Sequence, residues 1–233
     1  MWTFGICYSG NLYLNRIISS IKNQSTLSKN DFEIILIGPS DNDTSELYKK
    51  YKKKINIKHI VFEESIRPGW ITLKKNLIVQ NAEFENIYLA HDYVALCENW
   101  FTGFQQFGYD WDVCMTPVRL DDGRRHRDWF TQHRPLQFVN YNDNTQTKQM
   151  YINGTYWCGK KKFMLENPQN NNLTWGMGED CEWAYRCQNK WNYKLNPYSV
   201  VKYLKNKPES DLNPHPDIDP NKNEGYEICK VQE

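Results

Sequence analysis

Glu179 and Asp180 are two adjacent carboxylates whose place in the sequence suits a functional site. They follow the segment 175–178, which reads Trp-Gly-Met-Gly, where a loop is predicted to meet a helix. Unpaired N–H groups in the first turn of a helix favour negative side chains, and glycine lets a ligand approach the main chain closely. The pattern therefore indicates a carboxylate site beside a ligand. The plainer alternative is an acidic helix start between core tryptophans.

A second polar pair, His91 and Asp92, follows the apolar segment 86–90 at its carboxyl end. Divalent cations prefer oxygen ligands, and a nucleoside diphosphate brings oxygens of its own, so one or two protein ligands would suffice. Lys74 and Lys75, on the preceding predicted helix, could reach a pyrophosphate bound there. The alternatives are that His91 and Asp92 begin a turn and that the two lysines are solvated.

Predicted strands and helices alternate along the first half of the chain and must position these residues. The apolar patterns predict strands over 2–8, 31–37, 57–62 and 86–90, and helices over 12–21, 45–54 and from 71 onward. Such alternation is typical of a parallel sheet with helices on both faces, which binds ligands at the carboxyl ends of its strands. The sequence thus predicts an α/β fold with its site at that edge.

The second half of the chain is less regular, and we predict no separate second domain in it. Strands are expected over 112–118, 148–158 and 198–204, the second of them interrupted by Gly154, where a backbone can approach a ligand. Helices are expected from 163 to a point before Pro168, and from the Glu179 pair through Lys190. The strongly charged segment 121–134 is interpreted as a solvent-exposed loop.

Charge, cysteine content and hydropathy limit which partners the protein could bind and where in the cell it could be located. The 233 residues carry 29 basic and 28 acidic side chains, a net charge of +1, so no global field attracts nucleic acid. The seven cysteines contain no C-x-x-C motif, which indicates reduced thiols. No leader pattern opens the chain, and no segment reaches the length of a transmembrane span. We therefore expect a soluble cytoplasmic protein, either bacterial or viral in the cytoplasm of a host.

Together these motifs resemble those of the GT-A fold glycosyltransferases, with a first half like the large family-2 group. The segment 175–180 is similar to the Trp-Gly-x-Gly-Gly-Glu-Asp signature of β-1,4-galactosyltransferases, with one glycine fewer. The residues Lys-Lys-Asn at 74–76, before 86–92, resemble the Arg-Asn helix that leads into the metal-binding Asp-x-Asp strand. The segment 152–163 resembles the family's glycine strand, followed by a basic residue and Phe. The resemblance runs from Trp2 to Arg186.

The resemblance implies a single GT-A (Rossmann-like) domain with a mixed, mainly parallel central sheet flanked by helices. Its activity would be inverting, metal-assisted transfer of a hexose-type sugar from a nucleotide-sugar donor, with a UDP-sugar favoured. The acceptor would be a hydroxyl of a glycan, a lipid-linked molecule or a protein. Residues 1–96 would bind the donor, residues 97–205 the acceptor, and residues 206–233 would pack on or near the site.

Individual roles also come from the resemblance, and Asp180 would be the general base. The implied donor-binding residues lie at strand ends and on the helix before the Asp-x-Asp, and the implied acceptor-binding residues surround the Glu-Asp pair. The donor set is Tyr8, Ser9, Gly38, Ser40, Lys75, Asn76, His91, Asp92 and Gly154, and the acceptor set is Trp157, Trp175, Gly178, Glu179 and Arg186.

Two departures from the family pattern leave alternatives open. Either His91 and Tyr93 replace the two aspartates of the Asp-x-Asp, or Ala90 replaces the first and Asp92 is the second. Asp92 is the carboxylate that remains in both registers. Where family 2 has an aspartate that contacts uracil, this sequence reads Gly-Pro-Ser at 38–40, so the base of the nucleotide stays open.

A divalent cation, Mn²⁺ or Mg²⁺, is expected on Asp92, with His91 as a further candidate ligand. His215 lies 35 positions after Asp180, a distance comparable to that of the metal-binding histidine in related galactosyltransferases. Prolines on both sides restrict its backbone, and a nitrogen ligand would favour Mn²⁺. The alternative is an exposed histidine in a loosely held tail.

Two other classes of protein stay open. A sugar nucleotidyltransferase would share the sheet and the metal, but it needs a glycine-rich basic loop after the first strand. The segment 7–11, Cys-Tyr-Ser-Gly-Asn, has one glycine and no lysine. A non-catalytic protein that binds glycans or nucleotide sugars is favoured by the incomplete Asp-x-Asp and opposed by the intact Glu179 and Asp180.

Overall fold

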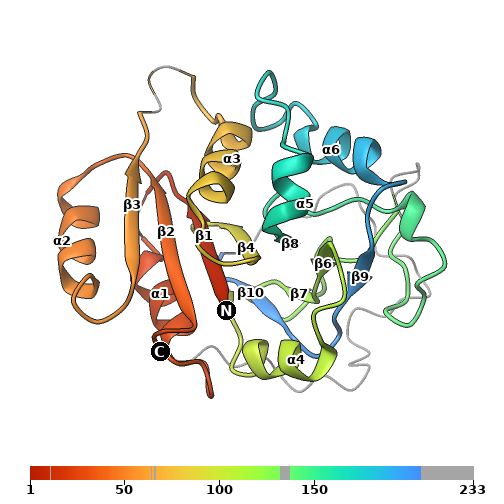
Figure 1. Ribbon diagram of the computed structural model, residues 1–233, viewed down its shortest axis with the longest axis horizontal. Coiled ribbons are helices and arrows are strands. Elements are labelled where there is room, and N and C mark those ends of the chain that lie inside the picture. The colour runs from red at the N-terminus through yellow and green to blue at the C-terminus, as the bar shows by residue number, and fades with distance from the viewer. Residues whose placement is uncertain (11, 64, 66, 132–136, 206–233) are drawn as a thin grey trace.

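A seven-stranded, mainly parallel sheet forms the centre of the molecule (Figure 1). The computed structural model describes residues 1–10, 12–63, 65, 67–131 and 137–205. In the order of the sheet, the strands are β3 (Ile57–Val61), β2 (Phe32–Gly38), β1 (Trp2–Cys7), β4 (Asn86–His91), β8 (Tyr156–Lys160), β6 (Val113–Met115) and β9 (Tyr193–Leu195). All neighbouring strands are parallel except β8, which is antiparallel to both β4 and β6. The predicted mixed, mainly parallel sheet is confirmed.

A second, smaller sheet of three strands lies beside the large one and includes the strand that directly follows β4. It consists of β5 (Val94–Leu96), β10 (Val201–Tyr203) and β7 (Val118–Arg119), with β10 in the middle, antiparallel to β5 and parallel to β7. β10 is the last strand of the described chain, and it pairs with β5, which directly follows β4.

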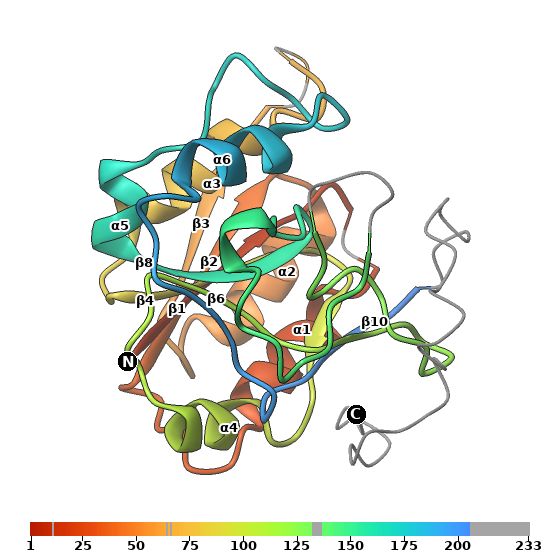
Figure 2. The same cartoon turned by 90° about the vertical axis from the view of Figure 1, so that its right-hand side faces the viewer.

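Helices cover both faces of the large sheet, as predicted (Figures 1 and 2). On one face α3 (Ile71–Asn81), α5 (Lys161–Glu166) and α6 (Glu179–Cys187) lie together, and a Cβ added to Gly5 of β1 would collide with Ile78 of α3. On the other face are α1 (Leu14–Lys22), α2 (Asn42–Tyr51) and α4 (Trp100–Phe107). There the Trp2 ring packs 4.8 Å from Trp100 and 4.7 Å from Phe104, measured between ring centroids. β1 is therefore buried on both sides, which explains its continuous apolar pattern.

Two predicted strands differ from the structure for local reasons. The segment 112–118 contributes to two sheets, because the strand is interrupted at Pro117, between β6 and β7. Within 148–158 the strand begins only at Tyr156. Before it, a 3₁₀ turn (Thr147–Gln149) precedes Asn153, whose side chain accepts a hydrogen bond from the Thr155 amide at 2.9 Å. Such local bonds compete with strand pairing. The structure also adds β5, α4 and β9, which the sequence patterns did not predict.

Three further predictions concern cysteines, membrane spans and the tail. Five described cysteines are free thiols, but Cys97 is disulfide-bonded, so the prediction of reduced thiols is wrong for Cys97. None of the described helices combines the length and apolar character that a membrane crossing needs. His215 and the rest of 206–233 lie outside the described residues.

Candidate active site

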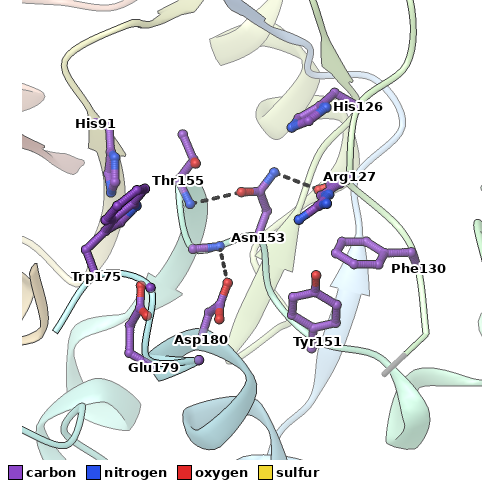
Figure 3. A pocket seen from close by; sticks show the side chains of 13 residues that line it. His91, His126, Arg127, Phe130, Tyr151, Asn153, Thr155, Trp175, Glu179 and Asp180 are labelled. Atoms are coloured by element: carbon purple, nitrogen blue, oxygen red, sulfur yellow. Dashed lines mark hydrogen bonds between the residues drawn. The ribbon is translucent and has the colours of Figure 1, made fainter. Parts of the chain in front are cut away.

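Two neighbouring pockets open at the edge of the large sheet where β1 and β4 end. The carboxylate pocket, as we call the first, has a volume of about 360 Å³ and is lined by residues that include Glu179, Asp180, Gly154, Tyr151, Phe130 and Arg127 (Figure 3). The second, the strand-end pocket, has a volume of about 300 Å³ and is lined by residues that include Tyr8, Ser9, Asp92, Tyr93, Lys74 and Lys205. Both pockets also include His91 and Trp175 in their linings, so these two side chains form a shared wall.

The Asp180 side chain is held in place by the main chain that leads into β8. The Gly154 amide donates to Asp180 Oδ2 at 3.1 Å (Figure 3). A Cβ built on Gly154 would lie 2.7 Å from that oxygen, closer than a real contact allows, so glycine is required for this approach. Gly178, with φ at +72°, starts α6 in the left-handed conformation that turns the chain into the helix. The two glycines thus fix where the Asp180 carboxylate lies.

Lys75 supports this arrangement from beneath. Its ammonium is buried and donates to the Gly154 carbonyl oxygen at 2.6 Å. Burial lowers the pKa of Lys75, while the nearby charges of Glu179 and Asp180 favour its protonated form. Lys75 therefore connects α3 to the start of β8 and places a positive charge next to the two carboxylates.

Glu179 lies deeper in the protein than its neighbour. Its side chain is buried, and burial together with the Asp180 charge raises the pKa of Glu179, while Lys75 acts in the opposite direction. A carboxyl group in such surroundings binds a proton more readily than a solvated one. The two adjacent carboxylates therefore differ in environment, although both line the carboxylate pocket.

Asp92 faces the strand-end pocket in a fixed orientation. Its Oδ2 accepts hydrogen bonds from the amides of Ser9 at 2.9 Å and Gly10 at 3.3 Å, in the loop that follows β1. Within the described residues, Oδ1 has no hydrogen-bond partner. The carboxylate is therefore held by one oxygen, and the other can bind a further group.

Two lysines bring positive charge to the same pocket. Lys74 donates from Nζ to the Tyr8 carbonyl oxygen at 3.4 Å, and Lys205 lies over the Tyr93 ring, 3.9 Å from its centroid. A pocket with two ammonium groups and one carboxylate suits a ligand that is itself anionic, such as a diphosphate.

The wall between the pockets joins segments that are distant in sequence. The His91 amide donates to the Thr155 carbonyl oxygen at 3.0 Å, which ties the end of β4 to the chain before β8. Trp175 is 71% exposed, and its amide donates to the Gly69 carbonyl oxygen at 2.9 Å. One strand end and one tryptophan therefore lie between Asp92 and Asp180.

Most of the residues predicted at the site meet at these two pockets. Tyr8, Ser9, His91 and Asp92 line the strand-end pocket. Gly154, Trp175, Gly178, Glu179 and Asp180 line the carboxylate pocket, so the segment before β8 lies with the acidic pair rather than with the predicted donor residues.

Other predicted residues lie away from both pockets. Trp157 is 1% exposed and packs on Trp183 of α6, 4.6 Å between ring centroids, so we withdraw the acceptor contact assigned to it. Asn76 is buried and holds the backbone of Gln169, donating to its oxygen at 2.8 Å and accepting from its amide at 2.9 Å. Arg186 pairs with Glu182 at 2.8 Å on α6.

The predicted donor-binding residues at the end of β2 lie outside both pockets. A Cβ on Gly38 would collide with the Tyr8 backbone, so this glycine permits close packing of β2 against the end of β1. Ser40 is exposed and lines neither pocket. The Tyr8 hydroxyl is bound to the Pro39 carbonyl oxygen and lies 2.6 Å from His59 Nε2.

Comparison with known proteins adds to this geometry. No family model matches the sequence, and no match is found among curated proteins. Among solved structures, TarS 1–349 from S. aureus matches with a TM-score of 0.62 and 14% identity, over 86% of this chain and 60% of that one. The same protein in complex with UDP-GlcNAc matches with a TM-score of 0.61 and 15% identity, over 90% and 60%. GalNAc-T7 with UDP, GalNAc and Mn²⁺ matches with a TM-score of 0.67 and 15% identity, over 87% and 43%.

The chain has the GT-A fold. At this level of identity the likeness concerns the fold, because unrelated chemistries share folds. The chain spans 43% to 60% of the length of these solved chains. Within the GT-A fold the two pockets lie at the carboxyl edge of the sheet, the edge at which the alternating strands and helices predict a ligand site.

Whether this GT-A site suits a divalent cation depends on its donor atoms. In the described part of the chain, no three His, Cys, Asp or Glu side chains gather in one cluster. What is present is the Asp92 carboxylate, held by the loop after β1, with His91 beside it in the pocket wall. This set fits a cation that takes most of its ligands from a bound diphosphate.

Several pocket residues were not found by sequence reasoning. The segment 121–134 was interpreted as a solvent-exposed loop, but Arg127 and Phe130 line the carboxylate pocket. The reason is a buried carboxylate, Asp128, which accepts from the Val118 amide at 3.0 Å and pairs with Arg125 at 2.7 Å. Two aromatic residues at 129 and 130, unusual in a solvated loop, were the signal available in the sequence.

Proposed function

We propose that the protein is an inverting glycosyltransferase that moves a sugar from a nucleoside-diphosphate donor, with a UDP-sugar favoured, to a hydroxyl of an acceptor. The observation that carries this proposal is the pair of pockets with a shared wall. One pocket contains a carboxylate held for proton transfer, and the other contains charges suited to a diphosphate. The fold likeness supports it, since TarS was solved with UDP-GlcNAc and GalNAc-T7 with UDP.

The arrangement suits direct displacement at the anomeric carbon. A sugar bound between the pockets would have the diphosphate on the Asp92 side of His91 and Trp175, and the acceptor hydroxyl on the Asp180 side. Asp180 would accept the hydroxyl proton as the oxygen attacks from the face opposite the leaving group, which inverts the configuration. A positioned carboxylate base is worth about a hundredfold to ten-thousandfold in rate.

The leaving diphosphate would be stabilised in the strand-end pocket. Lys74 and Lys205 would offset its negative charge. Asp92 would hold a divalent cation, with His91 as a further candidate; when bound, such a cation neutralises charge on the departing phosphate oxygens. GalNAc-T7, which shares the fold, was solved with Mn²⁺. His215 stays a predicted ligand outside the described residues.

The test is release of nucleoside diphosphate from a panel of nucleotide sugars, with and without acceptors, in Mn²⁺ and in chelator. We expect one UDP-sugar to be hydrolysed slowly by the wild type and not by Asp180→Asn, although that variant still binds it in calorimetry. If the wild type binds nucleotide sugars but never turns them over, the protein is a non-catalytic binder. If it binds none of them, the proposal is wrong.

A further inference from the structure

Arg127 enters the carboxylate pocket without a charged partner of its own. Its Nε is buried and has no hydrogen-bond partner among the described residues, and in that part of the chain the side chain forms no ion pair. The Tyr151 hydroxyl lies beside the guanidinium, but a neutral phenol does not balance its charge. A half-buried, uncompensated arginine is costly, which indicates that a ligand completes it.

The neighbouring Arg125 shows what a purely structural arginine looks like in the same loop. Its side chain is 9% exposed, pairs with Asp128 at 2.7 Å and donates to the Val139 carbonyl oxygen at 2.9 Å. These bonds anchor the segment between β7 and β8. Because Arg125 and Asp128 already perform that task, the folding of the loop does not explain the position of Arg127.

Arg127 is also not the counter-ion of the acidic pair. The cation that acts on Glu179 is Lys75, from beneath the Gly154 backbone. In Figure 3 the Arg127 guanidinium lies on the side of the pocket away from Glu179, next to Asn153 and above Tyr151. The pocket is therefore negative at one end and positive at the other.

Flat apolar groups line the positive end. The rings of Phe130 and Tyr151 pack edge to face, 4.0 Å between centroids, and both belong to the pocket wall. Such rings suit the C–H faces of a sugar or polyol, while a guanidinium matches the paired oxygens of a phosphate or carboxylate.

We propose that the acceptor is a sugar or polyol that carries an anionic group, phosphate or carboxylate, and that Arg127 binds this group while a hydroxyl faces Asp180. This inference rests on the proposed function and names the chemical class of its acceptor.

Binding is the first test, because it does not require turnover. Glucose, glucose 6-phosphate and glucuronate are titrated into the full chain by NMR, with UDP present to occupy the strand-end pocket. We expect the two anionic sugars to bind at least about tenfold more tightly than glucose, as a charge-assisted hydrogen-bonded pair provides. The phosphate and carboxylate probes together show which anion the pocket prefers.

Matched variants locate the effect. Arg127→Gln should abolish the difference between anionic and neutral sugars, and Arg127→Lys should keep part of it. Arg124→Gln is the control, since Arg124 lies in the same loop but pairs with Asp122 at 2.8 Å and lines neither pocket. The inference is overturned if glucose binds as tightly as the anionic sugars, if Arg127→Gln keeps the difference, or if Lys74→Gln abolishes it instead.

Assays of sugar transfer distinguish a failure of this inference from a failure of the proposed function on which it rests. With any donor that the enzyme uses, kcat/KM for an anionic acceptor should fall about tenfold or more in Arg127→Gln and should stay unchanged in the control Arg124→Gln. Equal use of charged and neutral acceptors by the wild type refutes the inference and leaves the glycosyltransferase proposal intact. Absence of donor turnover in every assay refutes the proposed function itself.

Discussion

Glu179 and Asp180 are neighbours in sequence, yet the fold gives them different surroundings. The Asp180 carboxylate is held by the Gly154 amide at 3.1 Å and stays partly accessible from the pocket. Glu179 is buried next to Lys75, and its pKa is raised. A base must reach its substrate, so in the proposed function the accessible carboxylate would take the proton and the buried one would position the acceptor.

We predict that Asp180→Asn lowers the rate of transfer by at least about a hundredfold, because an amide cannot accept the hydroxyl proton. Donor affinity and the thermal midpoint should change little, since an asparagine oxygen can still accept from the Gly154 amide. Steady-state kinetics and calorimetry with the donor check this. A loss confined to KM would mean that Asp180 is not the base.

We predict that Glu179→Gln lowers transfer less than Asp180→Asn does, and that it stabilises the protein at neutral pH. The folded-state pKa of Glu179 is raised above its usual value of 4.5, so the folded protein binds this proton more tightly than the unfolded chain. Its contribution to stability is complete below pH 4.5 and is lost as pH rises through the folded pKa.

The measurement is urea unfolding of the wild type and Glu179→Gln across that pH range. The advantage of the variant should grow with pH and level off above the folded pKa. If the difference in free energy of unfolding between the two proteins does not vary with pH, ionisation of Glu179 does not destabilise the folded state. If Glu179→Gln also proves the more severe change in transfer, the two roles are reversed.

At the scale of elements, the site depends on the few residues before β8. Gly154 lies between Asp180, which it contacts through its amide, and Lys75, which binds its carbonyl oxygen at 2.6 Å. Helices α3 and α6 therefore meet at one peptide segment. A change in this segment is expected to reach the acidic pair before it affects the rest of the fold.

We predict that Gly154→Ala lowers kcat by about tenfold or more, because the new methyl group would displace the Asp180 carboxylate from a position 2.7 Å away. The double variant with Asp180→Ala is the decisive comparison. When the carboxylate is absent, Gly154→Ala should cost little further activity, which gives a large coupling energy in the double-mutant cycle. Additive losses would show that Gly154 acts through the strand instead.

The elements of the first half could be predicted from sequence because their signals are local. Apolar runs and turns mark β1, β2 and β4, and the glycines before α6 mark the Glu179 pair. Burial was harder to predict, since it depends on distant contacts. Trp157 was assigned to the acceptor, but Trp183 from α6 covers it. Arg127 was missed because the buried pair of Arg125 and Asp128 determines the path of its loop.

At the scale of the whole molecule, the donor side is assembled from the loop after β1, the end of β4 and the lysines. The orientation of Asp92 depends on the amides of Ser9 and Gly10, so removal of its side chain would disturb the loop as well as the charge. Asparagine keeps an oxygen that can accept these bonds and loses the charge, which makes it the cleaner substitution.

We predict that Asp92→Asn weakens Mn²⁺-dependent donor binding by at least about tenfold, with little change in the thermal midpoint. Calorimetry with a nucleotide sugar, in Mn²⁺, Mg²⁺ and chelator, measures it. His215→Ala should weaken binding in Mn²⁺ more than in Mg²⁺ if the tail supplies a nitrogen ligand. Equal donor binding by the wild type in chelator and in Mn²⁺ would show that the lysines alone neutralise the diphosphate.

The pocket residues Arg127, Phe130 and Tyr151 all belong to one excursion of the chain between β7 and β8, whereas the residues around Asp92 come from other elements. The pairing of β4 with β8 determines where that excursion returns to the sheet. In the proposed function, the residues that would bind the anionic group of the acceptor therefore lie in one contiguous stretch of the gene, separate from the residues around Asp92. Exchange of this stretch between related chains would change what receives the sugar while leaving the sugar itself unchanged, so recombination offers a direct route to new acceptors.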